Sequence, residues 1–308
     1  VLVCHVSPDG DGIGSLVGLG RGLRQLGLRP TLVSPAPLPA KLAFILDSDL
    51  IQGQAPASFD LVIALDCSDL RRLGSLTQAP AFGQVPLLNI DHHLTNEAFG
   101  DVNLVSSAAS STAEVVLHLL RAMDVPIDDQ MATALLVGIV TDTRGFRTDN
   151  VTSHVVAAAL RLMEAGASLP EVTRKTLDTR PLAAIRLWGA ALANLQVEAG
   201  VVWAAIPLDM RRSVDFEGNG DAGLASFLIS AQEAQAAAVF VEQEDGSVEV
   251  GLRAMPGFDV AQVALQFGGG GHALAAGCPL PGPLSEAQDR FLRALKASLD
   301  AQRAARAG

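Results

Sequence analysis

The chain has 308 residues, 49% of them hydrophobic and 18% charged, which is a globular composition long enough for two domains. Its net charge of −11 argues against an extended surface for duplex nucleic acid, because such a surface needs a basic stripe. It does not exclude short anionic substrates. No apolar run approaches the roughly 20 residues of a membrane span. Three separated cysteines and no visible signal peptide favour a cytoplasmic protein.

The first half of the chain alternates apolar strands with helices. Residues 1–6 predict a short buried strand, and a glycine-rich loop leads from it into a helix over residues 14–27. Further strands are expected at "PTLVS", "FDLVIALD" and "PLLNIDHH", and further helices at "STAEVVLHLLRAM" and "DDQMATALLVGIVTDT". This alternation predicts an α/β domain with a doubly wound parallel sheet.

The second half changes character twice. Helical patterns dominate from residue 151, and strands return after residue 200, including a hairpin that turns at Asp245–Gly246. A glycine run, "FGGGGH", and an amphipathic helix follow. We therefore expect a catalytic domain over residues 1–185, a helical linker over 186–198 and a smaller α/β domain over 199–308, with a cleft between the domains.

Acids and imidazoles follow four apolar segments of the first domain. They are His5, Asp9 and Asp11 in "HVSPDGDGIGS", Asp66 in "ALDCSD", Asp91, His92 and His93 in "NIDHHLT", and Asp142 in "GIVTDTRGF". Ligands of open parallel sheets bind at the carboxyl ends of the strands, so we expect these side chains to converge on one site.

Such a set of side chains is typical of a metal centre. Several close carboxylates would raise each other's pKa unless a cation intervened. Oxygen and imidazole ligands suit Mn²⁺, Mg²⁺ or Fe²⁺ better than a structural zinc. Six potential ligands exceed the need of one ion, whereas two ions about 3.5–4 Å apart, joined by a shared carboxylate, would use them all in phosphoryl transfer.

Simpler explanations account for each segment taken alone. Asp66 can be a helix cap, and Asp9 and Asp11 can be turn residues. "GDGIGS" approximates a dinucleotide-binding fingerprint, but it ends in Ser and would place two acids against the pyrophosphate, and no Walker motif is present. Only the joint occurrence of all four segments favours the metal centre.

The second domain offers a site for an anion. The N–H groups of Gly268, Gly269, Gly270 and Gly271 can surround an anion, and His272 adds a donor. Arg253, at the end of an expected strand, can bind a phosphate through two N–H groups. A flexible turn with an exposed His and a surface Arg remains the alternative. Arg71, Arg72, Arg211 and Arg212 are expected to be solvated surface charges.

Taken in order, these motifs resemble those of the DHH phosphoesterase superfamily, named for the triplet that stands here at residues 91–93. The segment "GLRAM…FDVAQVALQFGGGGHALAAG" resembles the DHH-associated domain, so the resemblance covers nearly the whole chain. The compact layout is most similar to nano-RNases (oligoribonucleases) that also act as phosphatases of 3′-phosphoadenosine-5′-phosphate (pAp).

The resemblance implies a role for each matching residue. His5 and Asp9 would hold one Mn²⁺, Asp11, His92 and Asp142 would hold a second, and Asp66 would bridge the two. Asp91 would orient a ligating imidazole, and His93 would contact the scissile phosphate. Arg253, His272 and the glycines would bind the substrate's terminal phosphate and nucleotide, with Ser110, Ser111 and Thr112 as further polar contacts. Arg144 stands where relatives commonly have glycine, and it either contacts phosphate or points outward.

The implied activity is hydrolysis of short single-stranded RNA or DNA, from di- to pentanucleotides, and of pAp to AMP. Two divalent cations are implied, with Mn²⁺ ahead of Mg²⁺, Fe²⁺ or Co²⁺. A RecJ-like single-strand exonuclease, a soluble phosphodiesterase of cyclic or linear dinucleotides, an inorganic polyphosphatase or pyrophosphatase and a non-catalytic nucleotide sensor are the alternatives. Neither duplex nucleic acid nor a membrane is an expected partner, and the oligomeric state, including a homodimer, stays open.

Overall fold

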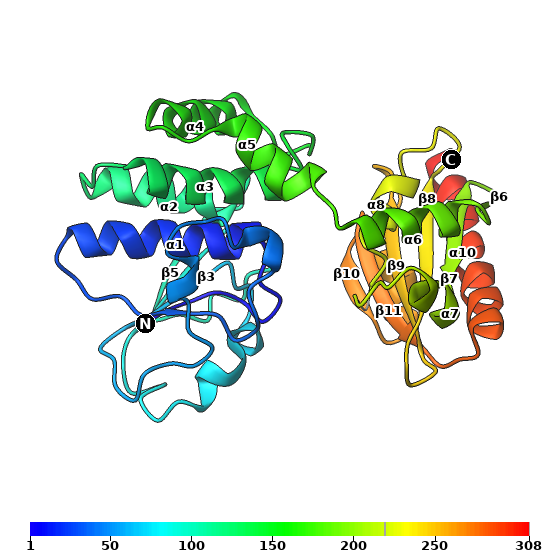
Figure 1. Ribbon diagram of the computed structural model, residues 1–308, viewed down its shortest axis with the longest axis horizontal. Helices are drawn as coiled ribbons and strands as arrows, with labels where there is room; N and C mark the ends of the chain where they lie inside the picture. The colour runs from blue at the N-terminus through cyan, green and yellow to red at the C-terminus, as the bar shows by residue number, and fades with distance from the viewer. Residues whose placement is uncertain (219, 308) are drawn as a thin grey trace. The chain divides into compact units, whose positions relative to one another are not determined.

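The computed structural model describes residues 1–218 and 220–307, and the chain divides into two units, Val1–Thr179 and Arg180–Gly308 (Figure 1). Each unit has its own sheet and its own hydrophobic core. Among the described helices, none combines the length and the hydropathy that a membrane span requires.

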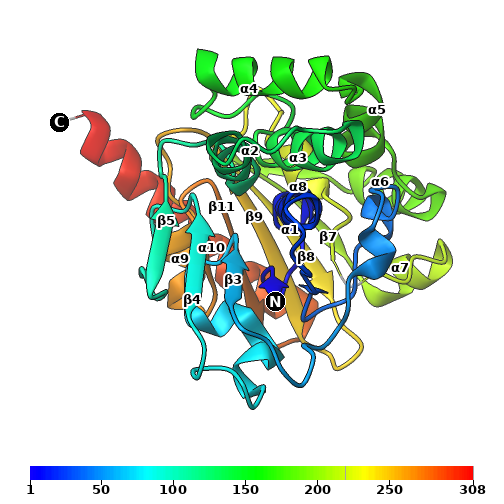
Figure 2. The same cartoon turned by 90° about the vertical axis from the view of Figure 1, so that its left-hand side faces the viewer.

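The described part of the first unit contains a five-stranded parallel sheet with the order β2-β1-β3-β4-β5. The strands are β1 (Leu2–Val3), β2 (Leu32–Val33), β3 (Val62–Leu65), β4 (Leu87–Asp91) and β5 (Val102–Val105). Figure 2 shows β3, β4 and β5 side by side. This sheet confirms the predicted α/β class, although the edge strand β5 was not anticipated.

Helices lie on one face of this sheet in successive layers, of which the first contacts the strands (Figure 1). They are α1 (Gly10–Gln25), α2 (Thr112–Ala122), α3 (Asp129–Asp142), α4 (Ser153–Glu164), α5 (Leu169–Thr173) and the π-helical turn η4 (Arg174–Asp178). Their apolar residues form one core with Leu2, Ile63 and Ile90 of the sheet. The other face packs against Leu73 and Leu76 of the 3₁₀ segment η3 (Leu70–Gln78). Two more 3₁₀ turns, η1 (Ala40–Leu42) and η2 (Ser48–Leu50), follow β2.

The glycine-rich segment after β1 corrects the expectation of a loop. Helix α1 already begins at Gly10, and the Asp9 carboxylate caps it by accepting the N–H groups of Asp11 and Gly12 at 3.1 and 3.0 Å. A side chain at Gly14 would place its Cβ 2.3 Å from the carbonyl oxygen of Ala134 in α3. The glycines therefore serve the close packing of two helices, which outweighs their low helix propensity.

The second unit has a mixed sheet of six strands within residues 180–218 and 220–307, with the order β10-β11-β9-β8-β7-β6. The strands are β6 (Gln196–Glu198), β7 (Val201–Ile206), β8 (Ala236–Glu242), β9 (Val248–Ala254), β10 (Gly270–His272) and β11 (Ala275–Leu280). Only the β7–β8 pair is parallel among these pairings. The predicted hairpin is present as β8 and β9, and Gly246 has a φ of 81° in its turn.

Helices cover both faces of the mixed sheet. They are α6 (Leu182–Leu192), α7 (Leu208–Ser213), α8 (Leu224–Leu228), α9 (Ala261–Gln266) and α10 (Leu284–Ala307). Leu187 of α6 and Leu224 of α8 belong to one core, whereas Val263 of α9 and Phe291 of α10 belong to the other. The glycine run is not a free loop, because its second half forms β10.

Candidate active site

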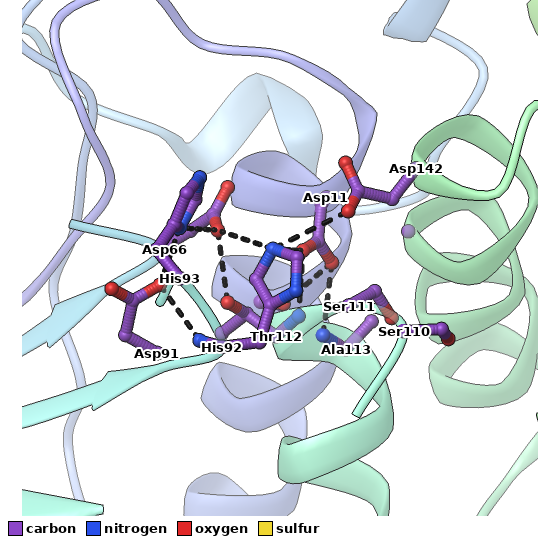
Figure 3. Close-up of polar contacts among 12 residues, drawn as sticks. Asp11, Asp66, Asp91, His92, His93, Ser110, Ser111, Thr112, Ala113 and Asp142 are labelled. Carbon is purple, nitrogen blue, oxygen red and sulfur yellow. Dashed lines mark hydrogen bonds and ion pairs between the residues drawn. The ribbon is translucent and has the colours of Figure 1, made fainter. Parts of the chain in front are cut away.

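The predicted ligands of the first unit lie at one edge of its sheet. His5 follows β1, Asp66 follows β3, and Asp91 is the last residue of β4. Helix α1 brings Asp11 to this edge in its first turn, and α3 brings Asp142 as its last residue. Figure 3 shows Asp11, Asp66, His92, His93 and Asp142 pointing toward one another. Segments more than a hundred residues apart therefore meet as the strand pattern predicted.

Asp66 is the central carboxylate of this cluster. Its Oδ2 lies 3.3 Å from Nε2 of His5, and its Oδ1 lies 3.7 Å from Nε2 of His92 and 3.6 Å from Nδ1 of His93. The side chain is almost fully buried, and the backbone has a φ of 61°, in the left-handed region. This turn after β3 places one carboxylate between imidazoles that come from two different strands.

Asp11 lies against the start of α2. Its Oδ2 accepts the N–H of Thr112 at 2.6 Å, and its Oδ1 accepts the N–H of Ala113 at 2.9 Å, so its charge sits at the positive end of a helix. Burial and the charges of Asp66 and Asp142 nonetheless raise the pKa of Asp11 well above its usual value. The local donors alone do not compensate for so many neighbouring carboxylates.

His92 and Asp142 complete a group with Asp11. Nε2 of His92 lies 3.3 Å from Oδ2 of Asp142 and 3.8 Å from Oδ2 of Asp11. Burial lowers the pKa of His92, so its ring is favoured in the neutral form that a metal ligand requires. Burial and the charge of Asp66 raise the pKa of Asp142 to about 7.

His5 forms the other group, with Asp9 and Asp66. Its Nε2 lies 3.5 Å from Oδ1 of Asp9. This nitrogen is buried and makes no hydrogen bond of good geometry within the described residues, although two carboxylates are close. Burial lowers the pKa of His5, but the carboxylates of Asp66 and Asp9 more than offset this effect and raise it to about 9. Since a ligating imidazole is neutral, metal binding here would release a proton.

The donor set fits divalent cations. Candidate ligand atoms of His5, Asp9 and Asp66 lie within 4.8 Å of one another, and so do those of Asp11, His92 and Asp142. A third such group joins Asp66 to residues 91–93. The raised pKa values and the buried, unpartnered His5 nitrogen are what carboxylate and imidazole ligands show when the stabilising positive charge is missing. Carboxylates mixed with imidazoles are ligands for Mn²⁺, Mg²⁺ or Fe²⁺.

Asp91 contacts the ring of His93 and the backbone of His92, the imidazole that the sequence placed among the metal ligands. Its Oδ1 accepts hydrogen bonds from Nδ1 of the His93 ring and from the backbone N–H of His92, both at 2.8 Å. Burial would raise the pKa of Asp91, but the hydrogen bonds that it accepts lower it to about 2. The bond from Asp91 in turn raises the pKa of His93. His93 is thus a fixed imidazole with a tendency to carry a proton.

Asn96, which was not predicted from the sequence, donates from Nδ2 to Oδ2 of Asp91 at 2.5 Å. Its position five residues after Asp91, in an irregular loop, carried no periodic signal. Glu114 is a further buried acid that was not predicted from the sequence. Its Oε2 accepts the N–H and the hydroxyl of Ser110 at 2.7 and 2.9 Å.

The hydroxyls of Ser110, Ser111 and Thr112 do not support the expected contact with substrate. All three residues are fully buried. Ser110 donates to Glu114, Ser111 caps α2 by accepting the N–H of Glu114 at 3.1 Å, and Thr112 donates to Oδ1 of Asp66 at 2.9 Å. These groups build the start of α2 and, through it, fix the carboxylates of Asp11 and Asp66.

Arg144 lies just past the end of α3 and is exposed. Its φ of 49° belongs to the left-handed region that favours glycine, and the N–H of Gly145 closes the helix by donating to Val140 at 2.7 Å. Its guanidinium makes no hydrogen bond or ion pair that links it to the cluster within the described chain.

Arg253 and His272 lie in one row of the second sheet. His272 of β10 pairs with Ala275 of β11, and Ala275 pairs with Arg253 of β9, so both side chains project from the same face. Arg253 donates from Nε to Ser226 at 3.0 Å and from Nη1 to the carbonyl of Leu252 at 2.7 Å. These contacts hold the guanidinium close to the sheet.

The four glycines before His272 have different roles. The N–H groups of Gly268 and Gly269 donate to Leu265 and Ala264 at the end of α9, at 3.1 and 2.9 Å. A Cβ on Gly269 would lie 2.1 Å from the carbonyl oxygen of Gly277 in β11, and a Cβ on Gly271 would lie 2.5 Å from that of Ala275 in the same strand. The first two amides are therefore already bonded, whereas Gly270 and Gly271 lie in the edge strand β10 and pair with β11 on one side.

One of the expected surface arginines is buried. Arg211 is 5% exposed, and its guanidinium donates to the carbonyl oxygens of Glu242 and Gly218, both at 2.8 Å. The expectation of a solvated charge at this position was wrong, because the carbonyl of Gly218, seven residues on, and that of Glu242 at the end of β8 accept its N–H groups. Arg71 and Arg212 are exposed, as expected.

Known proteins are similar to this chain over nearly its whole length. A family model described as "DHH family, N-terminal domain" matches residues 1–139, and the DHHA1 domain matches residues 214–301. The chain is 34% identical over 309 residues to the bifunctional oligoribonuclease and PAP phosphatase NrnA of Thermus thermophilus, covering 97% of this chain and 89% of the relative. The protein of the same name from Bacillus subtilis is 26% identical over 284 residues, covering 91% and 88%.

A solved structure shows the same fold. The crystal structure of an exopolyphosphatase-related protein from Bacteroides fragilis matches with a TM-score of 0.91 and 25% identity, over 98% of this chain and 93% of that one. The matching family models, the related sequences and this solved structure therefore confirm the resemblance that the motifs indicated. The chain belongs to the DHH family of phosphoesterases, and a DHHA1 domain follows its DHH domain.

Proposed function

We propose that this chain hydrolyses short single-stranded oligonucleotides, from di- to pentanucleotides, to mononucleotides and dephosphorylates pAp to AMP. The observation that carries the proposal is the position of Asp66 between His5 and His92, which joins two groups of ligand-type side chains through one carboxylate. Support comes from the relatives of Thermus and Bacillus, whose names give both activities and whose length this chain nearly spans.

We propose that two divalent cations bind the cluster, with Mn²⁺ ahead of Mg²⁺, Fe²⁺ or Co²⁺. His5 and Asp9 would hold one, Asp11, His92 and Asp142 the other, and Asp66 both. When bound, such a pair supplies Lewis-acid stabilisation of phosphoryl oxygens and a low-pKa water. The buried carboxylates would then be neutralised in place, without the protonation that their raised pKa values indicate.

His93 would act on the substrate. Asp91 fixes its ring through Nδ1, and the raised pKa of His93 favours the protonated ring, which donates a hydrogen bond to the developing charge on the phosphate. No serine or cysteine nucleophile is required. The cysteines that adjoin the cluster, Cys4 and Cys67, are buried with raised thiol pKa values, which makes them poor nucleophiles.

The DHHA1 domain would bind the far end of the substrate. Arg253 would bind a terminal phosphate, with His272 and the Gly270–Gly271 segment as further donors. Their shared row on the sheet supports this assignment. In this proposal residues 1–185 catalyse and residues 199–308 select short substrates, and the exposed Arg144 is a further phosphate contact.

A panel of substrates tests the proposal. Purified protein with Mn²⁺ would be given a labelled RNA dinucleotide, pAp, a cyclic dinucleotide and a long single strand in parallel. We expect turnover of the dinucleotide and of pAp and slow turnover of the long strand. Processive degradation of the long strand without action on pAp would favour a RecJ-like exonuclease. Tight nucleotide binding with no turnover of any substrate would indicate a sensor.

A further inference from the structure

Asn96 lies in the loop after β4 and uses every hydrogen-bonding position of its amide. Nδ2 donates to Oδ2 of Asp91 at 2.5 Å and to the carbonyl of Cys67 at 3.1 Å. Oδ1 accepts the backbone N–H of Ala98 at 2.7 Å and Nδ2 of Asn89 at 3.3 Å. An amide side chain has two donors and two acceptor positions, so all four are satisfied here.

The direction of this amide is fixed by the backbone. The carbonyl of Cys67 can only accept, and the N–H of Ala98 can only donate, so a flipped amide would lose both bonds. The NH₂ group must therefore face Asp91. This arrangement also ties the loop to Cys67, which directly follows the shared carboxylate of Asp66.

The amide of Asn96 helps to fix the orientation of the Asp91 carboxylate. Oδ1 already receives the His93 ring and the N–H of His92, and the bond from Asn96 fixes the opposite oxygen. A carboxylate held at both oxygens cannot rotate about its side-chain bond. Because an ionised carboxylate only accepts, the proton of a neutral His93 must be on Nδ1.

We propose that Asn96 is a positioning residue of the active site, which acts through Asp91 to fix the orientation and the Nδ1–H tautomer of His93. Its kinetic consequence rests on the proposed function, whereas the tautomer does not. In other enzymes, residues that hydrogen-bond to metal ligands or catalytic groups fix the orientation of those groups, and mutation of such residues typically lowers activity by about 10–100-fold.

The kinetic test compares Asn96→Ala and Asn96→Asp with wild type. The Asp variant keeps the shape and the bond from Ala98, but it removes the donations to Asp91 and to the carbonyl of Cys67 and adds a carboxylate beside Asp91. Thermal melting of both variants therefore has to separate positioning from folding of the loop. We expect kcat on an RNA dinucleotide to fall about 10–100-fold in both variants with KM little changed. Thr95→Ala, an exposed neighbour in the same loop, is the matched control and should retain wild-type kcat.

A double-mutant cycle tests the route through Asp91. If Asn96 acts through Asp91, Asn96→Ala should lower kcat by less than about 2-fold in an Asp91→Asn background, since coupled residues are not additive. An equal loss of kcat in both backgrounds would overturn the proposal. Thermal melting would show that each variant is folded.

A spectroscopic readout keeps the test independent of activity. Long-range ¹H–¹⁵N spectra of histidine-labelled protein with Mg²⁺, at a pH where His93 is neutral, report which ring nitrogen carries the proton. His93→Gln would assign the signal. We expect Nδ1–H in wild type and a substantial fraction of Nε2–H in Asn96→Asp. An unchanged Nδ1–H tautomer in that variant would contradict the proposal, even if no substrate of the panel is turned over.

Discussion

The hydroxyl of Thr112 donates a hydrogen bond of 2.9 Å to Oδ1 of Asp66, across 46 residues of sequence. The backbone N–H of the same residue donates to Asp11 at 2.6 Å. The first residue of α2 therefore orients two of the cluster's buried carboxylates, one through its side chain and one through its backbone.

Thr112→Val removes only the bond to Asp66, because the backbone N–H remains. We expect kcat to fall about 10–100-fold, since the shared carboxylate loses its orienting donor, while Thr112→Ser should stay near wild type. Steady-state kinetics on an RNA dinucleotide provides the measurement. Thr133→Val in α3, whose hydroxyl bonds only the carbonyl of Asp129, is the control. A fully active Thr112→Val would show that Asp66 needs no such support.

Removal of metal should make stability depend on pH. A carboxyl whose pKa is raised in the folded state contributes stability below its usual pKa of 3.8, and this contribution is lost as pH rises toward its folded pKa. Asp142, with a folded pKa of about 7, and Asp11, with a strongly raised pKa, follow this rule. The raised pKa of His5, about 9, acts in the same direction between pH 6.5 and 9.

We therefore expect the Tm of chelator-treated protein to fall between pH 5.5 and pH 8.5, despite the opposite contribution of His92 with its lowered pKa. Added Mg²⁺ or Mn²⁺ should restore the Tm most at the upper end of that range. Differential scanning fluorimetry across the range would measure both effects. A Tm that rises with pH in the chelator would contradict these pKa assignments.

Arg253→Ala should weaken substrate binding. A charge-assisted hydrogen bond contributes about 1.5–3 kcal/mol, so KM for pAp should rise by about 10–100-fold with kcat little changed. Arg253→Lys should be intermediate, because an ammonium cannot form the paired bonds of a guanidinium. Arg212→Ala, an exposed arginine paired with Glu244, is the control. An unchanged KM would remove Arg253 from the binding site.

Substitution of a glycine in α1 should lower the stability of the protein. Gly14→Ala would bring its Cβ within 2.3 Å of the carbonyl oxygen of Ala134, so we expect a loss of about 1–3 kcal/mol and a lower Tm. Gly189→Ala is the matched change in α6, where nothing lies within 4 Å of the added Cβ. It should stabilise by about 0.5–1 kcal/mol. Equal effects of the two changes would show that α1 and α3 are not closely packed.

The sequence predicted the convergence of the candidate ligands because that convergence depends on simple topology. His5, Asp66 and Asp91 each end or follow a visible apolar run, and parallel strands bring their carboxyl ends to one edge of the sheet. Hydrogen-bond partners could not be predicted in the same way. The amide of Asn96 is directed by Cys67 and Ala98, whose positions exist only in the folded loops.

The missed elements have physical causes as well. All four residues of β5 are exposed, so the strand lacks the buried alternation by which strands are recognised. Gly10 and Gly12 were expected in a loop because of their low helix propensity, whereas α1 already begins at Gly10, which lies close to Thr141 of α3. Burial of Arg211 likewise depends on the carbonyl groups of Gly218 and Glu242, which only the folded chain brings to its side chain.

The central claim is that Asp66 joins two cation sites of a phosphoesterase, and Asp66→Asn tests it most directly. Metal analysis after equilibration with Mn²⁺ and hydrolysis of an RNA dinucleotide and pAp would be measured on the same samples, with Asp60→Asn, before the opposite end of β3, as control. We expect wild type and control to bind two Mn²⁺ and turn over both substrates, and Asp66→Asn to lose at least one ion and about 1,000-fold or more in kcat. Full metal content and full activity in Asp66→Asn would contradict the account.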